Sequence, residues 1–246
     1  MSMKKTILIL LGLFALQSCV KDDTDLTCMA DCTTIRGQLV TAKGEPLKNI
    51  PVALNYHVSY GVGATLRKIK ETKTDQNGNY SMQFYIKDDE LGANAEGLFE
   101  LMLDYGNLDP EVYMDTSPYY MHAIYSIPKR DTTMTMDFYN PKKAFITVNL
   151  SGFNPIQPED YLKMESFIPF GLKIGQNDIW DSEYAIGYGT SFKASSPDTK
   201  LDRVIVAESD YSIISIRRWK NGVGLMDQDT ILFIPENNKI ELNFTY

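Results

Sequence analysis

The fold is decided by the stretch TIRGQLVTAKGEPLKNIPVALNY, which spans residues 34–56. Apolar and polar side chains alternate around Leu39 and again around Leu54, as expected when one face of a strand is buried. Between these runs, Gly44-Glu45-Pro46-Leu47 has the composition of a turn, because proline fixes its own φ and glycine tolerates a positive one. The stretch therefore predicts two strands joined by a tight connection.

A second informative stretch is TDQNGNYSMQFYI, residues 74–86, in which the pair NG at 77–78 is a strong turn signal and alternation resumes from Tyr80. Four segments together resemble the carboxypeptidase regulatory-like domain: GQLV at 37–40, GEPL at 44–47, PVAL at 51–54, and TD at 74–75 with Gly78 and Tyr80. The resemblance covers about residues 34–86. It implies a transthyretin-like (prealbumin-like) β-sandwich, and it carries no catalytic residues.

The rest of the chain continues in short strands, so the sequence predicts an all-β protein of two tandem β-sandwiches. The first domain spans 34–140 with a long insertion at 87–130, and the second spans 141–246 after the boundary at Asn140-Pro141. One short helix is expected within 157–167, after Pro158. Strands are expected at 98–103 and 119–127 in the insertion, and at 145–150, 170–174, 204–207, 211–217, 231–234 and 240–246 in the second domain.

The first 18 residues have the pattern of a signal peptide: two lysines precede a ten-residue apolar run at 7–16. That run is shorter than the ~20 residues needed to span a bilayer. The sequence LQSC at 16–19 resembles the lipobox of bacterial lipoproteins, which implies removal of residues 1–18 and acylation of Cys19. The only membrane contact then expected is this N-terminal lipid.

Residues 19–33 are expected to form an acidic tether. Within it, KDDTD at 21–25 resembles the surface-export signal of lipoproteins in one phylum of Gram-negative anaerobes. This resemblance implies an outer-membrane protein, lipid-anchored and facing the cell exterior. A plain solvated linker is the alternative, because like charges keep linkers extended.

Two cysteines follow the tether. An exported chain allows disulfides, and acylation of Cys19 leaves Cys28 and Cys32 as an even pair. A disulfide between them is possible and stays open here, whereas a metal site would need more than two thiolates.

The composition excludes several functions. The chain has 32 acidic and 24 basic residues, a net charge of -8, which argues against a nucleic-acid partner. No nucleophile elbow, HExxH motif or phosphate-binding loop occurs, so we expect no enzyme activity, no cofactor and no metal. His57 and His122 are expected to be structural. The acidic loop 104–115 offers oxygen ligands without the EF-hand spacing, and calcium binding there stays open.

Aromatic clusters are the remaining candidates for a ligand site, because rigid rings suit both sugar stacking and protein contacts. The candidates are Tyr105 and Tyr113 in the insertion, and Trp180 and Tyr184 in the second domain. The sequence thus predicts a lipid-anchored surface protein that is a non-catalytic binding or assembly module, with polysaccharide or another surface protein as partner. Two alternatives stay open: a glycan-capture accessory lipoprotein of a nutrient-uptake system, and an adhesive or structural subunit of a surface appendage.

Overall fold

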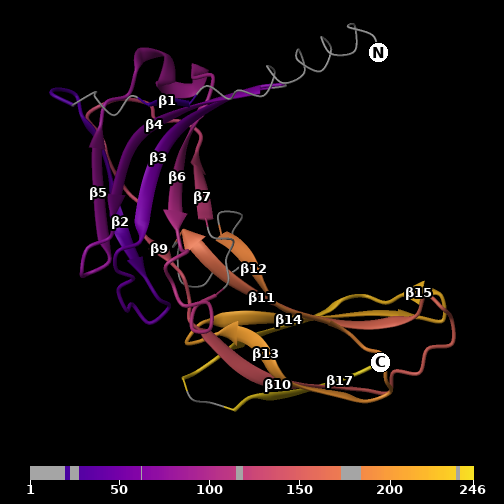
Figure 1. The fold of residues 1–246 in the computed structure, drawn as a ribbon. Helices are drawn as coiled ribbons and strands as arrows, with labels where there is room; N and C mark the ends of the chain where they lie inside the picture. Colours follow the sequence, from indigo (N-terminus) through magenta and orange to yellow (C-terminus); the bar gives the residue numbers. More distant parts are fainter. Residues whose placement is uncertain (1–19, 23–27, 62, 115–118, 173–183, 237–238) are drawn as a thin grey trace, which may run out of the picture.

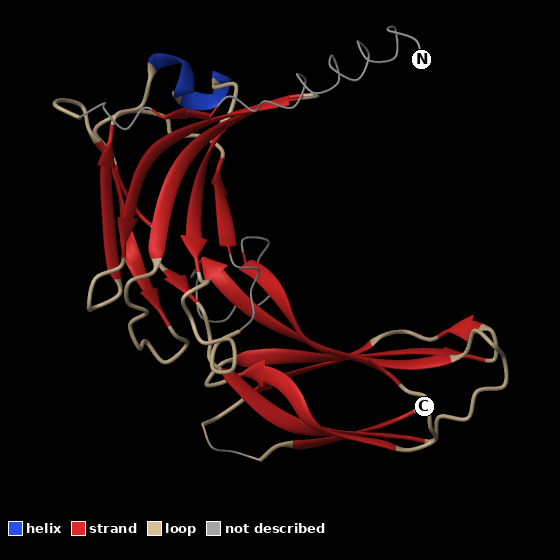
Figure 2. Cartoon of the chain, viewed as in Figure 1, coloured by secondary structure: helices blue, strands red, loops and turns tan. Residues whose placement is uncertain are grey.

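The computed structural model describes residues 20–22, 28–61, 63–114, 119–172, 184–236 and 239–246. Helical residues within these ranges are confined to two 3-10 turns, η2 (Asp88–Glu90) and η3 (Gly92–Asn94). Figures 1 and 2 show two β-sandwiches that meet at an angle. No helix in the described part of the chain is long and apolar enough to cross a bilayer. The predicted all-β sandwich fold is confirmed.

Two sheets build the first sandwich. Across the first sheet the strands are β1 (Val20–Asp22), β4 (Gly63–Lys73), β3 (Pro51–Tyr60), β6 (Leu98–Asp104) and β7 (Tyr119–Ile124). The facing sheet contains β5 (Asn79–Phe84), β2 (Thr33–Val40), β8 (Thr133–Thr135) and β9 (Phe138–Tyr139).

The turn at 75–79 connects β4 of one sheet to β5 of the other, so it is a corner between layers, where the dipeptide signal alone indicated a hairpin. The carboxylate of Asp75 accepts hydrogen bonds from the amides of Asn77 and Asn79, both at 2.8 Å. Gly78 is required here, because its φ is +76° and a Cβ would lie 2.4 Å from the carbonyl oxygen of Leu39.

The segment 87–130 is an integral part of the first sandwich. It supplies β6, which pairs with β3 on one side and with β7 on the other. The strand expected at 119–127 ends at Ile124. Alternate residues of β6, such as Leu101 and Leu103, point into the core and are fully buried. Removing the segment would therefore remove β6 and β7, two of the five strands of the first sheet.

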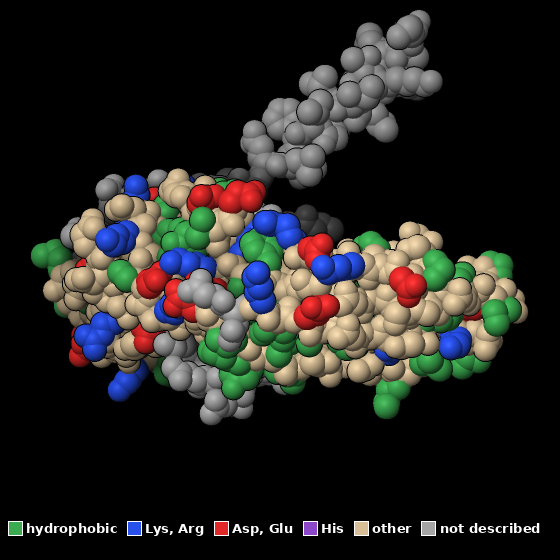
Figure 3. Space-filling model, turned by 90° about the horizontal axis from the view of Figure 1, so that it is seen from below, with side chains coloured by type: hydrophobic (Ala, Val, Ile, Leu, Met, Phe, Trp, Pro, Cys, Tyr) green, Lys and Arg blue, Asp and Glu red, His purple; other side chains and the backbone are tan. Residues whose placement is uncertain are grey.

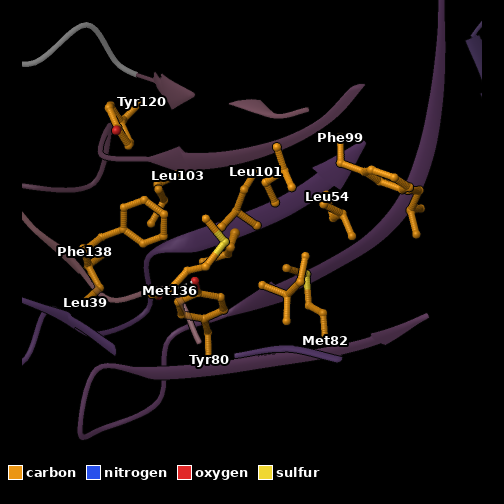
Figure 4. Packing of buried hydrophobic residues seen from close by; sticks show 14 of the residues in the cluster. Leu39, Leu54, Tyr80, Met82, Phe99, Leu101, Leu103, Tyr120, Met136 and Phe138 are labelled. Atoms are coloured by element: carbon orange, nitrogen blue, oxygen red, sulfur yellow. Dashed lines mark hydrogen bonds between the residues drawn. The ribbon is translucent and has the colours of Figure 1, made fainter. Parts of the chain in front are cut away.

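The core of the first sandwich is rich in aromatic rings (Figure 4). Phe138 of β9 lies between Tyr80 and Tyr120, with ring centroids 6.5 and 5.8 Å away. The hydroxyl of Tyr80 donates to the carbonyl of Met136 at 2.7 Å, which satisfies this otherwise buried polar group.

The second sandwich has a three-stranded sheet in the order β13 (Thr199–Ala207), β10 (Lys143–Ser151) and β17 (Glu241–Thr245). The facing sheet is built around β11 (Tyr161–Leu172) and β14 (Tyr211–Lys220), flanked by β12 (Tyr184–Lys193), β15 (Val223–Gly224) and β16 (Gln228–Phe233). Asn221-Gly222, with φ of +55° and +75°, turns the chain after β14.

The helix expected within 157–167 is wrong. This segment enters β11, a twelve-residue strand that pairs with β12 and β14. Leu162 and Met164 alternate into the second core, and the two strand neighbours satisfy the backbone of this segment from both sides. Burial of every second side chain favours a strand over a helix here, and Pro158 precedes this strand without starting a helix.

The two sandwiches share one sheet. The end of β11 leaves the second sandwich and pairs with β9, through Gly171 with Tyr139 and Leu172 with Phe138. Because β9 pairs with β2, a single ladder runs from β15 through β14, β11, β9 and β2 to β5. The boundary at 140/141 stays a prediction, and the structure adds that the end of β11 belongs to the first core, where Phe170 packs on Tyr120 with ring centroids 5.5 Å apart.

Candidate functional site

The predicted ligand contact at Tyr105 requires correction. Its side chain is only 5% exposed and belongs to the core of the first sandwich. Burial raises the pKa of the Tyr105 hydroxyl above its ordinary value, because the phenolate would be desolvated. Tyr113 is half-buried and also packs against this core. Tyr105 therefore offers no ring face to a ligand, because it directly follows β6 in the middle of the sheet.

The loop 104–115, expected to be a solvated acidic loop, docks on the junction between the sandwiches. The amide of Lys143 donates to the carbonyl of Val112 at 2.7 Å, and the amide of Met114 donates to that of Pro141 at 3.2 Å. Met114 is buried in a small apolar cluster with Ile168 and Ala207 of the second sandwich. The loop thus braces the joint.

Acidic side chains of this loop accept hydrogen bonds from backbone amides within the loop. Asp104 accepts from the amide of Gly106 at 2.8 Å, and Asp109 accepts from the amide of Glu111 at 2.9 Å. Across the described ranges, no group of three or more His, Cys, Asp or Glu side chains is arranged to hold a metal ion. Calcium binding at 104–115 therefore gains no support from these residues; Asp115 lies outside the described part.

Ion pairs cross the junction. Lys43, in the turn after β2, lies 2.6 Å from Glu236 and 3.7 Å from Glu208 of the second sandwich. Lys142 forms an ion pair with Glu45, which lies in the same turn as Lys43. In Figure 3, basic and acidic side chains alternate across the middle of this face without forming a patch of one sign. Together with the shared sheet and the docked loop, these pairs fix the angle between the two sandwiches.

The other predicted site residues are described only in part. Cys19 and Trp180 lie outside the described residues, and Tyr184 is described only as the first backbone position of β12, opposite Gly171. Cys28 and Cys32 form a disulfide, with their Cα atoms 5.6 Å apart.

The two histidines occupy opposite faces of the first sheet. His57 lies on the outer face, and its Nδ1 lies 2.7 Å from a carboxylate oxygen of Glu100. His122 faces inward, with its ring 6.0 Å from that of Phe138. Glu100 is buried and His57 is half-buried, so the contact is a part-buried hydrogen bond, and within the described ranges no metal-binding cluster lies beside it.

Sequence reasoning missed the surface on which exposed apolar side chains concentrate. Thirteen large hydrophobic side chains are exposed among the described residues, and six of them lie between positions 211 and 233, along the β14–β15–β16 hairpin. These six define the hairpin surface: Tyr211, Val223, Leu225, Met226, Ile231 and Phe233. A strand is expected at 231–234, and the alternation in DTILF at 229–233 is the available signal for an apolar outer face.

The geometry of this surface is that of an open edge. Among the described strands, β16 has a hydrogen-bonded neighbour, β14, on one side only. Ile231 and Phe233 lie on the face of β16 that points away from the second core, and Phe233 contacts Tyr211 across the ladder with ring centroids 5.4 Å apart. A second open edge is β7, where Tyr119 and Met121 are exposed.

Comparison with known proteins adds little. No family model matches the chain, and no curated protein matches it. Solved structures that resemble it include the Bacillus anthracis TIE protein (9% identity, 87% of this chain and 33% of that chain, TM-score 0.27) and the shaft pilin SpaA of Lactobacillus rhamnosus GG (10%, 87% and 96%, 0.28). A third is the tip fimbrial protein Mfa3 of Porphyromonas gingivalis (11%, 84% and 82%, 0.28). The chain spans a third of the first of these. Similarity at this level says nothing about function.

Proposed function

We propose that the chain is a lipid-anchored cell-surface protein that acts as a non-catalytic assembly module, as an adhesive or structural subunit of a surface appendage. The observation that carries the proposal is the hairpin surface on the open edge of β16. Tyr211, Ile231 and Phe233 lie together at one end of this hairpin, and Val223, Leu225 and Met226 lie at the other. Exposed apolar clusters of this kind are typical of protein contacts. Open strand edges add main-chain groups that a partner strand can pair with.

Two further features support an assembly role. A chain-like appendage needs two contact surfaces on each subunit, since a heterologous contact joins different faces. The apolar edge at Tyr119 and Met121 of β7 provides a second surface on the other sandwich. The braced joint would keep the two edges at a fixed angle, as a structural subunit requires.

The glycan-capture alternative loses part of its basis, because Tyr105 is buried and Tyr113 half-buried. It now depends on Trp180 and Tyr184. Polysaccharide binding that falls in Trp180→Ala and persists in the hairpin variants would favour glycan capture over assembly.

The lipid anchor rests on the lipobox-like LQSC at 16–19. Its test is palmitate labelling in the native host. We expect labelling of the full-length protein and none of Cys19→Ala, which should also leave the membrane fraction. Retained labelling in that variant would exclude acylation at Cys19.

The assembly role is tested on cells with Ile231→Lys/Phe233→Lys. Because both side chains are exposed, the melting temperature should hardly change, whereas the protein should move from high-mass surface assemblies to the monomer fraction. The matched control is Ile156→Lys, which also charges an exposed isoleucine, in the loop before β11. Assemblies of unchanged size in the double variant would argue against the hairpin surface.

A further inference from the structure

The strand β1 fixes the start of the mature chain to the first sandwich. Val20, Lys21 and Asp22 pair in parallel with Leu66, Arg67 and Lys68 of β4. The neighbouring residue, Cys19, lies within about 3.8 Å of Val20 between Cα atoms, as consecutive residues must. Residues 20–22, within the segment expected to be a tether, are therefore held on a sheet edge.

The direction of β1 decides which part of the sandwich lies beside Cys19. Because β1 runs parallel to β4, its first residue, Val20, is the end of β1 that lies toward the hairpin joining β3 and β4. That hairpin projects past its neighbour β6, whose pairing with β3 ends at His57. Figure 2 shows the β3–β4 end as the far corner of the first sandwich, at the opposite end from the second sandwich.

The chemistry of this hairpin end differs from the rest of an acidic protein. Nine consecutive residues, 58–66, contain no charged side chain. Tyr60 is 55% exposed, and Gly61, Gly63 and Ala64 are exposed beside it. An exposed tyrosine among small uncharged residues suits the boundary between lipid tails and headgroups, where tyrosine is enriched.

Two exposed lysines complete the pattern. Lys68 and Lys70 lie on β4 just beyond the uncharged hairpin. With a rise of about 3.3 Å per residue, Lys68 is roughly 13 Å from Ala64 along the strand. Lysines at that distance from an inserted tip lie at the level of lipid phosphates, which attract them.

We infer that the β3–β4 hairpin end, with Tyr60, Gly61, Gly63 and Ala64, rests in the interface of the bilayer that holds the Cys19 lipid, with Lys68 and Lys70 facing the phosphates. This inference depends on the proposed lipid anchor. The first sandwich then stands on its hairpin end, and the junction and the second sandwich are held away from the membrane. The partner of this surface is the lipid bilayer.

The experiment uses single cysteine labels on the full-length, acylated protein in vesicles of phosphatidylethanolamine and phosphatidylglycerol. Because Cys28 and Cys32 are bridged and Cys19 would be acylated, an introduced cysteine is the free thiol for an environment-sensitive dye. Tyr60→Cys and Ala64→Cys report on the hairpin end. The matched controls are Lys48→Cys, exposed at the opposite end of the same sandwich, and Met226→Cys, 93% exposed in the second sandwich.

We expect a blue shift of dye emission at positions 60 and 64 on vesicle binding, and quenching there by spin-labelled lipid. Positions 48 and 226 should show neither. Protein that floats with the vesicles while positions 60 and 64 behave like position 226 would overturn the hairpin contact and leave the anchor intact. Protein that fails to float would instead overturn the anchor. A blue shift at position 60 that persists in the Cys19→Ala background would show that the hairpin binds lipid by itself and would strengthen the inference.

Discussion

Arg67 and Glu90 form a buried ion pair that allows a quantitative test of how the first sandwich is held together. The Nε of Arg67 donates to Glu90 at 2.7 Å and Nη2 makes the second contact, while the amide of Lys87 donates to the same carboxylate at 3.0 Å. Arg67 and Glu90 are 6% and 3% exposed. Arg67→Met would leave the Glu90 carboxylate buried without its cation, and removing one partner of such a pair costs about 3–5 kcal/mol. For a chain of this length, that corresponds to a fall of roughly 6–20 °C in melting temperature.

The measurement is urea unfolding of wild type and variant, followed by intrinsic fluorescence and circular dichroism. A double variant, Arg67→Met/Glu90→Leu, should recover much of the loss, because an apolar pair of similar volume avoids burying a lone charge. Lys200→Met is the control: its pair with Asp202 is exposed and screened by solvent, so the free energy of unfolding should hardly change. A loss below about 1 kcal/mol in Arg67→Met would refute the buried, bidentate geometry.

We expect Gly171→Ala to lower the free energy of unfolding by about 1–3 kcal/mol, because φ at Gly171 is +97° and a Cβ would lie 2.6 Å from the ring of Tyr120. Gly63→Ala is the control: a Cβ there meets open space, so its thermal unfolding should match that of wild type. Hydrogen bonds from the amides of Asn79 and Asn77 hold the pKa of Asp75 below its ordinary value, so its contribution is present above the unfolded pKa and is lost as the pH falls through the lower folded pKa. Unfolding free energies measured between about pH 5 and pH 2 should therefore fall less steeply for Asp75→Asn than for wild type, and identical slopes would contradict the turn geometry. A fragment of residues 142–246 lacks β9, so the end of β11 is exposed to solvent in it. We expect this fragment to unfold cooperatively only if Leu172 is made polar or covered. Cooperative unfolding of the unaltered fragment would mean that the end of β11 tolerates solvent.

Much of the fold could be predicted from local pattern. The alternation around Leu39 and Leu54 has a direct physical cause, the burial of one face, and both strands appear where they were expected. The helix expected after Pro158 fails for a different reason. A proline before an apolar run is compatible with both a helix start and a strand start, and the pairing partners β12 and β14 that decide between them lie 20 or more residues away.

The candidate site was harder to predict, because exposure depends on tertiary neighbours. An insertion relative to a family pattern indicates where extra chain occurs, and it does not say whether that chain joins the sheet. Tyr105 lies one residue past β6, and it is buried because β6 pairs on both sides. The apolar edge at Ile231 and Phe233 has the same alternation as a half-buried strand, and only the missing neighbour of β16 among the described strands distinguishes the two.

The sheet that passes from one sandwich to the other also determines how the molecule would respond to pulling. Tension between a lipid at the N-terminus and a partner held on β16 has to pass from the first sandwich to the second. The backbone ladder available for this at the joint is short, two residue pairs between β9 and β11, whereas β11 and β14 are joined by seven. The joint should therefore yield before either sandwich does. A first, small extension in a single-molecule stretching trace would come from the release of β11 from β9, which also withdraws Phe170 and Leu172 from the edge of the first core.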